Sequence, residues 1–259
     1  MFSPSTLDPR SMLFWSGLPF IATQGLWLKR RAYRAPEAPG PRHGLIECDA
    51  GGPPLRLRAL GDSIIAGVAL ASTADALPAQ LARALSAQTM RSVDWQALGR
   101  NGADASEALS AAHADSSSFR DCDLVLISIG VNDVTGLRRR RAFASDLSAL
   151  IDWLHGQSPK ARIVFCATPP LEVFPLLPSP LRHLMGLRAR QFDQVIARAA
   201  ESQPLALHAP IPFRPDASGF ADDGFHPNSA SVARWSEWLS GQVLQRWSDL
   251  GRPSTPIRV

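Results

Sequence analysis

A short alternating stretch that ends in Gly-Asp-Ser is the feature that most constrains the fold of this chain. Residues 55–59 read Leu-Arg-Leu-Arg-Ala, and apolar side chains at every second position are typical of a β-strand. Gly61 follows, and a glycine can adopt backbone angles that other residues avoid. Ser63 then lies just past the end of the strand, where open α/β sheets bind their ligands. Ser63 is therefore a candidate nucleophile, although Gly-Asp-Ser is also a common turn sequence.

Beyond this stretch, strand-like and helix-like segments alternate along the chain. Further strands are expected at residues 93–98, 124–129, 161–167 and 205–207, with apolar helical stripes between them. The segment 124–129 is almost wholly apolar, as in a strand that is covered on both faces. This alternation predicts an α/β fold of three layers, α/β/α, around a sheet of five parallel strands.

Composition allows one domain with an appendage and argues against a nucleic-acid partner. The chain has 259 residues, of which 45% are hydrophobic, so it can bury a full core. The net charge is +4, and the basic runs at residues 29–31 and 138–141 have no aromatic residues interleaved with them. The three cysteines are too few and too widely spaced for a disulfide framework or a zinc site. Cys166 fits a reduced thiol in the core.

The N-terminal part is expected to be separate from the main domain. Residues 12–28 are mostly apolar and precede the basic run, which predicts a helix at the short limit for crossing a bilayer. A membrane anchor, a signal peptide and a helix packed on the domain all remain open. If the helix inserts, the basic run keeps the domain in the cytoplasm at the inner membrane, with a periplasmic or secreted protein as the alternative.

Domain boundaries follow from the glycine and proline content. Residues 35–54 contain five prolines and four glycines and are expected to form a linker. The predicted division is residues 1–54 for the apolar segment and linker, 55–250 for the main domain and 251–259 for a flexible tail.

Polar residues follow the other predicted strands on the edge that bears Ser63. Acyl transfer needs a nucleophile, a base, a carboxylate that orients the base, and donors for the oxyanion. His226 can act as the base, with Asp223 three residues earlier to hold its ring. Gly102 offers a backbone N–H and Asn132 a side-chain amide, beside the N–H of Ser63 itself. Each of these short sequences is also common in turns or helix caps, so their combination and order carry the hypothesis.

Together the four blocks resemble the SGNH (GDSL-type) serine hydrolases. The matching residues are Gly61-Asp62-Ser63, Gly102, Gly130-Val131-Asn132-Asp133 and Asp223-Gly224-Phe225-His226. The resemblance implies a flavodoxin-like fold, a catalytic set of Ser63, Asp223 and His226, an oxyanion hole from Ser63, Gly102 and Asn132, and no metal or cofactor. The chain departs from the usual pattern at Ile64, where leucine is common, and at Asn101, where serine often precedes the glycine. Asn101 directly precedes Gly102, so this departure can change the local loop and the direction of the Gly102 N–H.

The expected substrate is a small-molecule or lipid acyl ester. Residues 168–178 form a long apolar loop after the fourth strand, and Phe174, Leu176 and Leu177 are expected to line an acyl site or lid, or else to pack on the core. The N-terminal part also resembles esterases linked to long-chain N-acyl-amino-acid synthesis, which favours fatty acyl groups.

Three functions follow as alternatives. The expected one is a serine esterase, lipase or acyl thioesterase. The others are a carbohydrate acetyl esterase and a non-catalytic flavodoxin-like binding module. The basic run at residues 138–141 suggests an acyl carrier protein or a lipid headgroup as partner, or simply a solvated helix face.

Overall fold

The computed structural model describes residues 9–251, except residues 32, 34, 50–51 and 212–216. The predicted tail lies outside the described residues apart from Gly251. The domain division predicted from the sequence remains a prediction.

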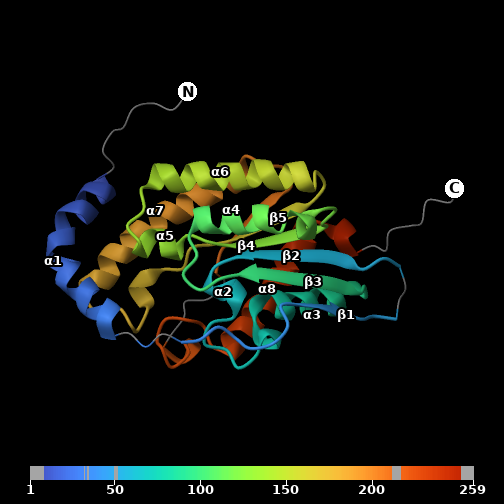
Figure 1. Ribbon diagram of the computed structural model, residues 1–259, viewed down its shortest axis with the longest axis horizontal. Helices are drawn as coiled ribbons and strands as arrows, with labels where there is room; N and C mark the ends of the chain where they lie inside the picture. The colour runs from blue at the N-terminus through green and yellow to red at the C-terminus, as the bar shows by residue number, and fades with distance from the viewer. Residues whose placement is uncertain (1–8, 32, 34, 50–51, 212–216, 252–259) are drawn as a thin grey trace.

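A six-stranded sheet forms the centre of the molecule (Figure 1). Its order is β1-β3-β2-β4-β5-β6, and the pairs from β3 to β6 are all parallel. The strands are β1 (His43–Ile46), β2 (Leu55–Gly61), β3 (Val93–Gly99), β4 (Leu124–Ser128), β5 (Arg162–Cys166) and β6 (Ala206–Ala209). The five predicted parallel strands are therefore confirmed.

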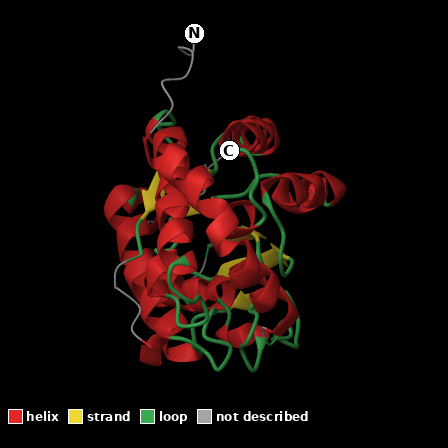
Figure 2. Cartoon of the chain, turned by 90° about the vertical axis from the view of Figure 1, so that its left-hand side faces the viewer, coloured by secondary structure: helices red, strands yellow, loops and turns green. Residues whose placement is uncertain are grey.

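Helices cover both faces of the sheet, which gives the predicted three layers (Figures 1 and 2). The helices on one face are α4 (Ala105–Ala114), α6 (Arg140–Gln157) and α7 (Leu181–Glu201); those on the other are α3 (Leu77–Thr89) and α8 (Ser229–Arg246). In β4, Val125 and Ile127 belong to one hydrophobic cluster, whereas Leu124 and Leu126 belong to the other. This strand has to be apolar throughout because both of its faces are buried.

Short helices occupy several of the connections. They are α2 (Ser63–Ala66), α5 (Val131–Thr135) and the 3₁₀ turns η1 (Thr73–Asp75), η2 (Ser116–Phe119), η3 (Leu171–Val173), η4 (Ala217–Gly219) and η5 (Ser248–Gly251).

The strand order determines where a ligand can bind. From β2 the chain moves to β3 on one side, and later crosses to β4 on the other side of β2. The loops after β2 and β4 therefore diverge, and open α/β sheets bind ligands in such a crevice. Helix α2, with Ser63 at its start, follows β2, and α5 follows β4.

The stretch predicted to be a linker adds a strand to the sheet. Residues His43–Ile46 form β1, which pairs antiparallel with β3 at the sheet edge. Sequence patterning did not indicate this strand because none of its four residues is buried, so no apolar alternation marks it.

The N-terminal helix α1 (Pro9–Arg31) is present where a helix was predicted, and it packs on α7. Phe14 is buried, and the Gln24 side chain meets the start of α7, accepting from Leu181 N at 3.2 Å and donating to Ser179 O at 2.9 Å. This contact agrees with the alternative of a helix packed on the domain. Among the described helices, none combines the length and the hydropathy that a bilayer span requires.

Candidate active site

Ser63 is the first residue of α2, directly after β2. Gly61 makes the turn possible, because its φ is +149° and a Cβ there would lie 1.9 Å from the backbone oxygen of Ser128. Asp62 caps the helix, and its Oδ1 accepts from Ile64 N at 3.1 Å. The turn therefore holds Ser63 at the carboxyl end of β2, where the residue as a whole is 8% exposed.

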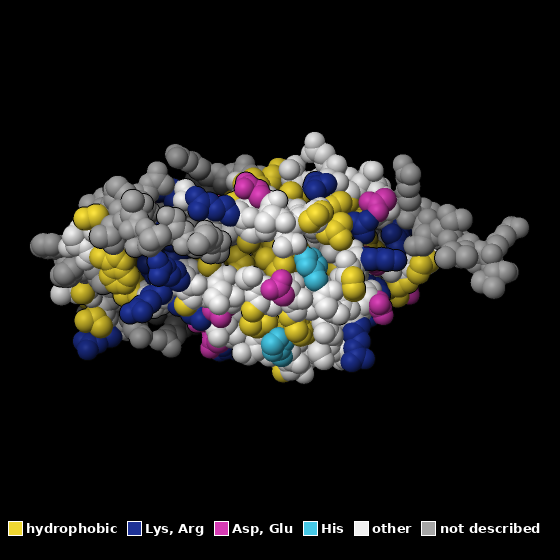
Figure 3. All heavy atoms as spheres, turned by 90° about the horizontal axis from the view of Figure 1, so that it is seen from above, with side chains coloured by type: hydrophobic (Ala, Val, Ile, Leu, Met, Phe, Trp, Pro, Cys, Tyr) yellow, Lys and Arg dark blue, Asp and Glu magenta, His cyan; other side chains and the backbone are white. Residues whose placement is uncertain are grey.

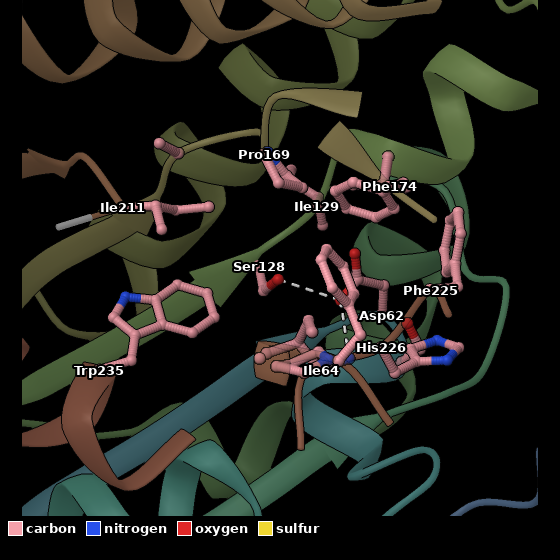
Figure 4. Close-up of a pocket in the computed structure, with 16 residues that line it drawn as sticks. Asp62, Ile64, Ser128, Ile129, Pro169, Phe174, Ile211, Phe225, His226 and Trp235 are labelled. Carbon is pink, nitrogen blue, oxygen red and sulfur yellow. Dashed lines mark hydrogen bonds between the residues drawn. The ribbon is translucent and has the colours of Figure 1, made fainter. Parts of the chain in front are cut away.

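The Asp62 carboxyl is buried next to Ser63. Burial raises its pKa to about 7, although hydrogen bonds from Ile64 N and the Ser128 hydroxyl act in the opposite direction. Ser128 Oγ donates to Asp62 Oδ1 at 3.0 Å (Figure 4). The bonds from Ile64 N and Ser128 Oγ hold the turn together, so the Asp62 side chain positions Ser63 through the backbone of the turn.

Asp223 and His226 form a hydrogen-bonded pair in the loop before α8. His226 Nδ1 lies 2.6 Å from Asp223 Oδ2, and Asp223 Oδ1 accepts from the backbone N–H groups of Phe225 and His226, each at 2.9 Å. Burial alone would raise the pKa of Asp223, but these three hydrogen bonds outweigh it and lower the pKa. An ionised Asp223 accepts a hydrogen bond from the Nδ1–H group, which leaves Nε2 as the basic atom of the ring.

The loop that carries this pair is fixed at both ends. Gly224 has a φ of +64°, and its carbonyl accepts from Leu176 N at 3.1 Å. Asn228 caps α8 by accepting from Ser231 N at 3.0 Å, and its Nδ2 donates to Ser218 O at 2.7 Å. The imidazole therefore has a defined position.

Gly102, in the loop after β3, and Asn132, in α5, lie close together. Asn132 Nδ2 donates to Ala103 O at 2.9 Å, which places the amide beside Gly102. Because this nitrogen carries two hydrogens, one remains for a substrate oxygen. Gly102 is exposed with a φ of +81°, and a Cβ there would have no heavy atom within 4 Å.

Asp133 is a supporting residue whose role the sequence did not reveal. Its buried carboxylate accepts from Ala105 N at 3.2 Å and lies 3.1 Å from Arg138 Nη1. Burial raises its pKa to about 6, against the effect of Arg138. These bonds join α5 to the start of α4, and so they fix Asn132 relative to Gly102.

Ser63 and His226 line one pocket at this edge of the sheet (Figure 4). The apolar lining residues are Ile64, Ile129, Val131, Ala167, Pro169, Phe174, Ile211, Phe220, Phe225, Pro227 and Trp235. Figure 4 shows Trp235 and Ile211 on one side of the pocket, and Phe225 and His226 on the other. Among the described residues, no hydrogen bond joins Ser63 Oγ to the His226 ring, whose Nδ1 is bonded to Asp223.

The three residues predicted to bind the acyl chain lie in different places. Phe174 lines the pocket and contacts the rings of Phe220 and Phe225. Leu177 is buried in the hydrophobic core, and Leu176 is half-buried and bonds the histidine loop through its backbone. The pocket residues from α8 and the β6 end were not predicted, because their spacing in sequence carries no sign that they converge.

Comparisons with known proteins identify the family. A family model described as the GDSL-like Lipase/Acylhydrolase family matches residues 59–234. No curated protein matches the chain.

Several solved structures share the fold. A lipase from a goat rumen metagenome has a TM-score of 0.61 at 17% identity, covering 72% of this chain and 96% of that one. The aryl esterase of M. Smegmatis has a TM-score of 0.59 at 18% identity, covering 74% and 99%. A carbohydrate esterase family 2 enzyme of Corynascus thermopiles has a TM-score of 0.60 at 18% identity, covering 77% and 68%.

Identities this low show a shared fold and carry no information about the substrate. The family model, by contrast, spans more than half of the sequence and includes the Gly-Asp-Ser turn, both loops beside it and the histidine. The chain therefore belongs to the GDSL-like lipase/acylhydrolase (SGNH) family and is an ester hydrolase.

Proposed function

We propose that the protein is a serine esterase or lipase that acts on esters of apolar acyl chains through an acyl-enzyme. The observation that carries the proposal is the apolar lining of the pocket that holds Ser63 and His226. An alkyl chain gains free energy by leaving water for such a surface. The hydroxyl groups of a sugar would find few partners there, which costs free energy.

In the proposed mechanism Ser63 Oγ attacks the acyl carbonyl carbon while His226 Nε2 takes its proton. Asp223 holds the ring and stabilises the imidazolium that forms. The N–H groups of Ser63 and Gly102 and the Asn132 amide donate to the oxyanion. His226 then protonates the leaving alcohol or thiol, and water attacks the acyl-enzyme in the same way, which releases the acid and restores Ser63.

The proposal also specifies the length of the acyl chain. The resemblance of the N-terminal part to esterases linked to N-acyl-amino-acid synthesis supports long chains, whether as esters or thioesters. A carbohydrate acetyl esterase would use the same catalytic residues and is the second candidate.

A series of p-nitrophenyl esters from acetyl to palmitoyl tests this proposal. We expect a fluorophosphonate to label Ser63, no labelling of Ser63→Ala, and a kcat/KM that rises beyond the acetyl ester. Because Ile211 lies on the far side of the pocket from His226, Ile211→Trp should move the optimum to shorter chains and Ile211→Ala should not.

Two results would contradict it. A kcat/KM that falls steadily from acetyl onwards would favour the acetyl esterase. An unlabelled wild-type protein without esterase activity would favour a binding module.

We also propose that the outer face of α1 lies on an anionic phospholipid surface. This face carries Met12, Trp15, Leu26 and Trp27, each between 48% and 60% exposed, together with exposed Arg30. Aromatic and basic side chains on one helix face suit the interface between lipid headgroups and acyl chains. Figure 3 has Lys and Arg side chains beside hydrophobic ones at this end of the molecule.

The start of α6 extends this basic surface. The Arg188 guanidinium of α7 lies 5.7 Å from the Trp15 ring centre and donates to Arg138 O, so it bridges α1 and the first residue of the basic run. Arg138 itself pairs with Asp133 and Asp146, whereas residues 139–141 are exposed. A planar anionic surface could contact α1 and this basic run at the same time. This favours an anionic phospholipid surface over an acyl carrier protein as the partner.

A further inference from the structure

The segment that precedes β1 passes beside the catalytic loops, although it lies outside the residues that the family model matches. We call residues 35–42 the strap. Ala35 and Ala38 are buried, and strap carbonyls accept from Ala69 N and Thr73 N, each at 3.0 Å. The strap is thus packed against the residues that follow α2, the helix that begins at Ser63.

One strap side chain bonds the loop that holds Gly102. Glu37 Oε1 accepts from the backbone N–H of Asn101 at 2.6 Å, and its other oxygen pairs with Arg42. Arg42 in turn donates to the carbonyl of Gly99. The pair therefore holds both the beginning and the middle of the loop formed by residues 99–102.

The same loop touches the nucleophile turn. A Cβ on Gly99 would lie 2.5 Å from Ala66 N in α2, and Arg100 N donates to Gly61 O at 3.1 Å. Gly102, by contrast, has open space around its Cα and gains no rigidity from side-chain packing of its own. Its position relative to Ser63 depends on the hydrogen bonds of its neighbours.

We propose that Glu37 is a positioning residue for the oxyanion hole, because it fixes the Asn101 amide and thereby directs the adjacent Gly102 N–H toward the substrate oxygen. The proposal rests on the function proposed above. Burial raises the pKa of Glu37, but the Asn101 N–H and Arg42 outweigh this effect and lower the pKa, which favours the carboxylate. An ionised acceptor makes a stronger hydrogen bond than a neutral one.

The test compares Glu37→Ala with Glu37→Gln, which keeps an acceptor oxygen for Asn101. Steady-state kinetics on one p-nitrophenyl ester give kcat and KM, and a trifluoromethyl ketone with the same acyl chain measures how well the oxyanion is held. We expect Glu37→Ala to lower kcat about tenfold with KM little changed. This loss is smaller than the roughly 10²–10³-fold expected for Asn132→Ala, which removes a proposed donor. Ketone affinity should fall by the same factor as kcat/KM, and Glu37→Gln should recover most of both.

The control is Glu237→Ala, an exposed glutamate on α8, which should match the wild type. An unchanged kcat in Glu37→Ala, or a lower kcat with unchanged ketone affinity, would overturn the proposal. If Glu37→Ala does not fold, Glu37→Asp replaces it, because the shorter side chain should reach Asn101 poorly and give the same pattern. A wild-type protein that neither hydrolyses esters nor reacts with fluorophosphonate would instead refute the proposed function.

Discussion

The buried carboxyl of Asp62 makes stability depend on pH. Its pKa is about 7 in the folded protein, against 3.8 for an ordinary aspartate. Between these pH values the folded state holds a proton that the unfolded state has lost. The contribution of Asp62 to the free energy of unfolding therefore falls as pH rises from about 4 to 7, and it changes no further above pH 7. The turn that holds Ser63 therefore has a cost in stability at neutral pH.

Replacing Asp62 by asparagine tests this cost. Asn keeps an oxygen that can accept from Ile64 N and Ser128 Oγ, yet it cannot ionise. The free energy of unfolding of Asp62→Asn, relative to wild type, should increase with pH from about 4 to 7, by on the order of 1–4 kcal/mol at about 1.4 kcal/mol per pKa unit. Urea unfolding across this range measures the difference. Buried Asp133, whose pKa is about 6, is present in both proteins. A difference that does not vary with pH would contradict the prediction.

At the scale of elements, the contact between β2 and β4 depends on one residue without a side chain. A Cβ on Gly61 would lie 1.9 Å from the Ser128 carbonyl oxygen, which belongs to a central strand and cannot move freely. Gly61→Ala should therefore lower the free energy of unfolding by at least ~3–4 kcal/mol and disturb Ser63.

The matched control is Gly241→Ala in α8, where a Cβ meets nothing within 4 Å. There alanine should stabilise the helix by roughly 0.5–1 kcal/mol. Thermal or urea unfolding of both variants checks the pair of predictions, and equal effects at the two glycines would contradict the first.

Elements also differ in how well their sequence predicts them. The strand Leu124–Ser128 was predicted because burial on both faces leaves a continuous apolar run. The stripe of α6 was predicted because burial on one face leaves a periodic apolar pattern. Strand β1 carries no such pattern, since it is held by backbone pairing with β3 at an edge. The proline-rich strap was predicted to be a linker because it also lacks a periodic apolar pattern.

At the scale of the whole molecule, the proposed lipid surface leads to a binding prediction. The full-length protein should sediment with vesicles containing phosphatidylglycerol and less with pure phosphatidylcholine, and added salt should weaken the binding. The double variant Trp15→Ser/Trp27→Ser should lose most of it, because tryptophan anchors a helix at the lipid interface.

Exposed apolar residues elsewhere provide the control. Leu45 and Met90 are 51% and 60% exposed outside α1, and Leu45→Ser/Met90→Ser should bind vesicles like the wild type. Equal binding by both double variants, or equal binding to neutral and anionic vesicles, would contradict the role of this face.

Sequence alone was enough to predict the three-layer fold, the five parallel strands and the residue types suited to acyl transfer. Because parallel strands end on the same side of a sheet, the sequence predicted Ser63, Gly102, Asn132 and His226 in loops on that side. The structure has Ser63 at the start of α2 and Asn132 in α5. The surroundings of these residues depend on the folded chain: the pocket wall from Ile211 and Trp235, the packing of α1 on α7, and the contact of Glu37 with Asn101. These contacts join residues far apart in the chain, and no local pattern marks them because only the folded backbone brings the residues together.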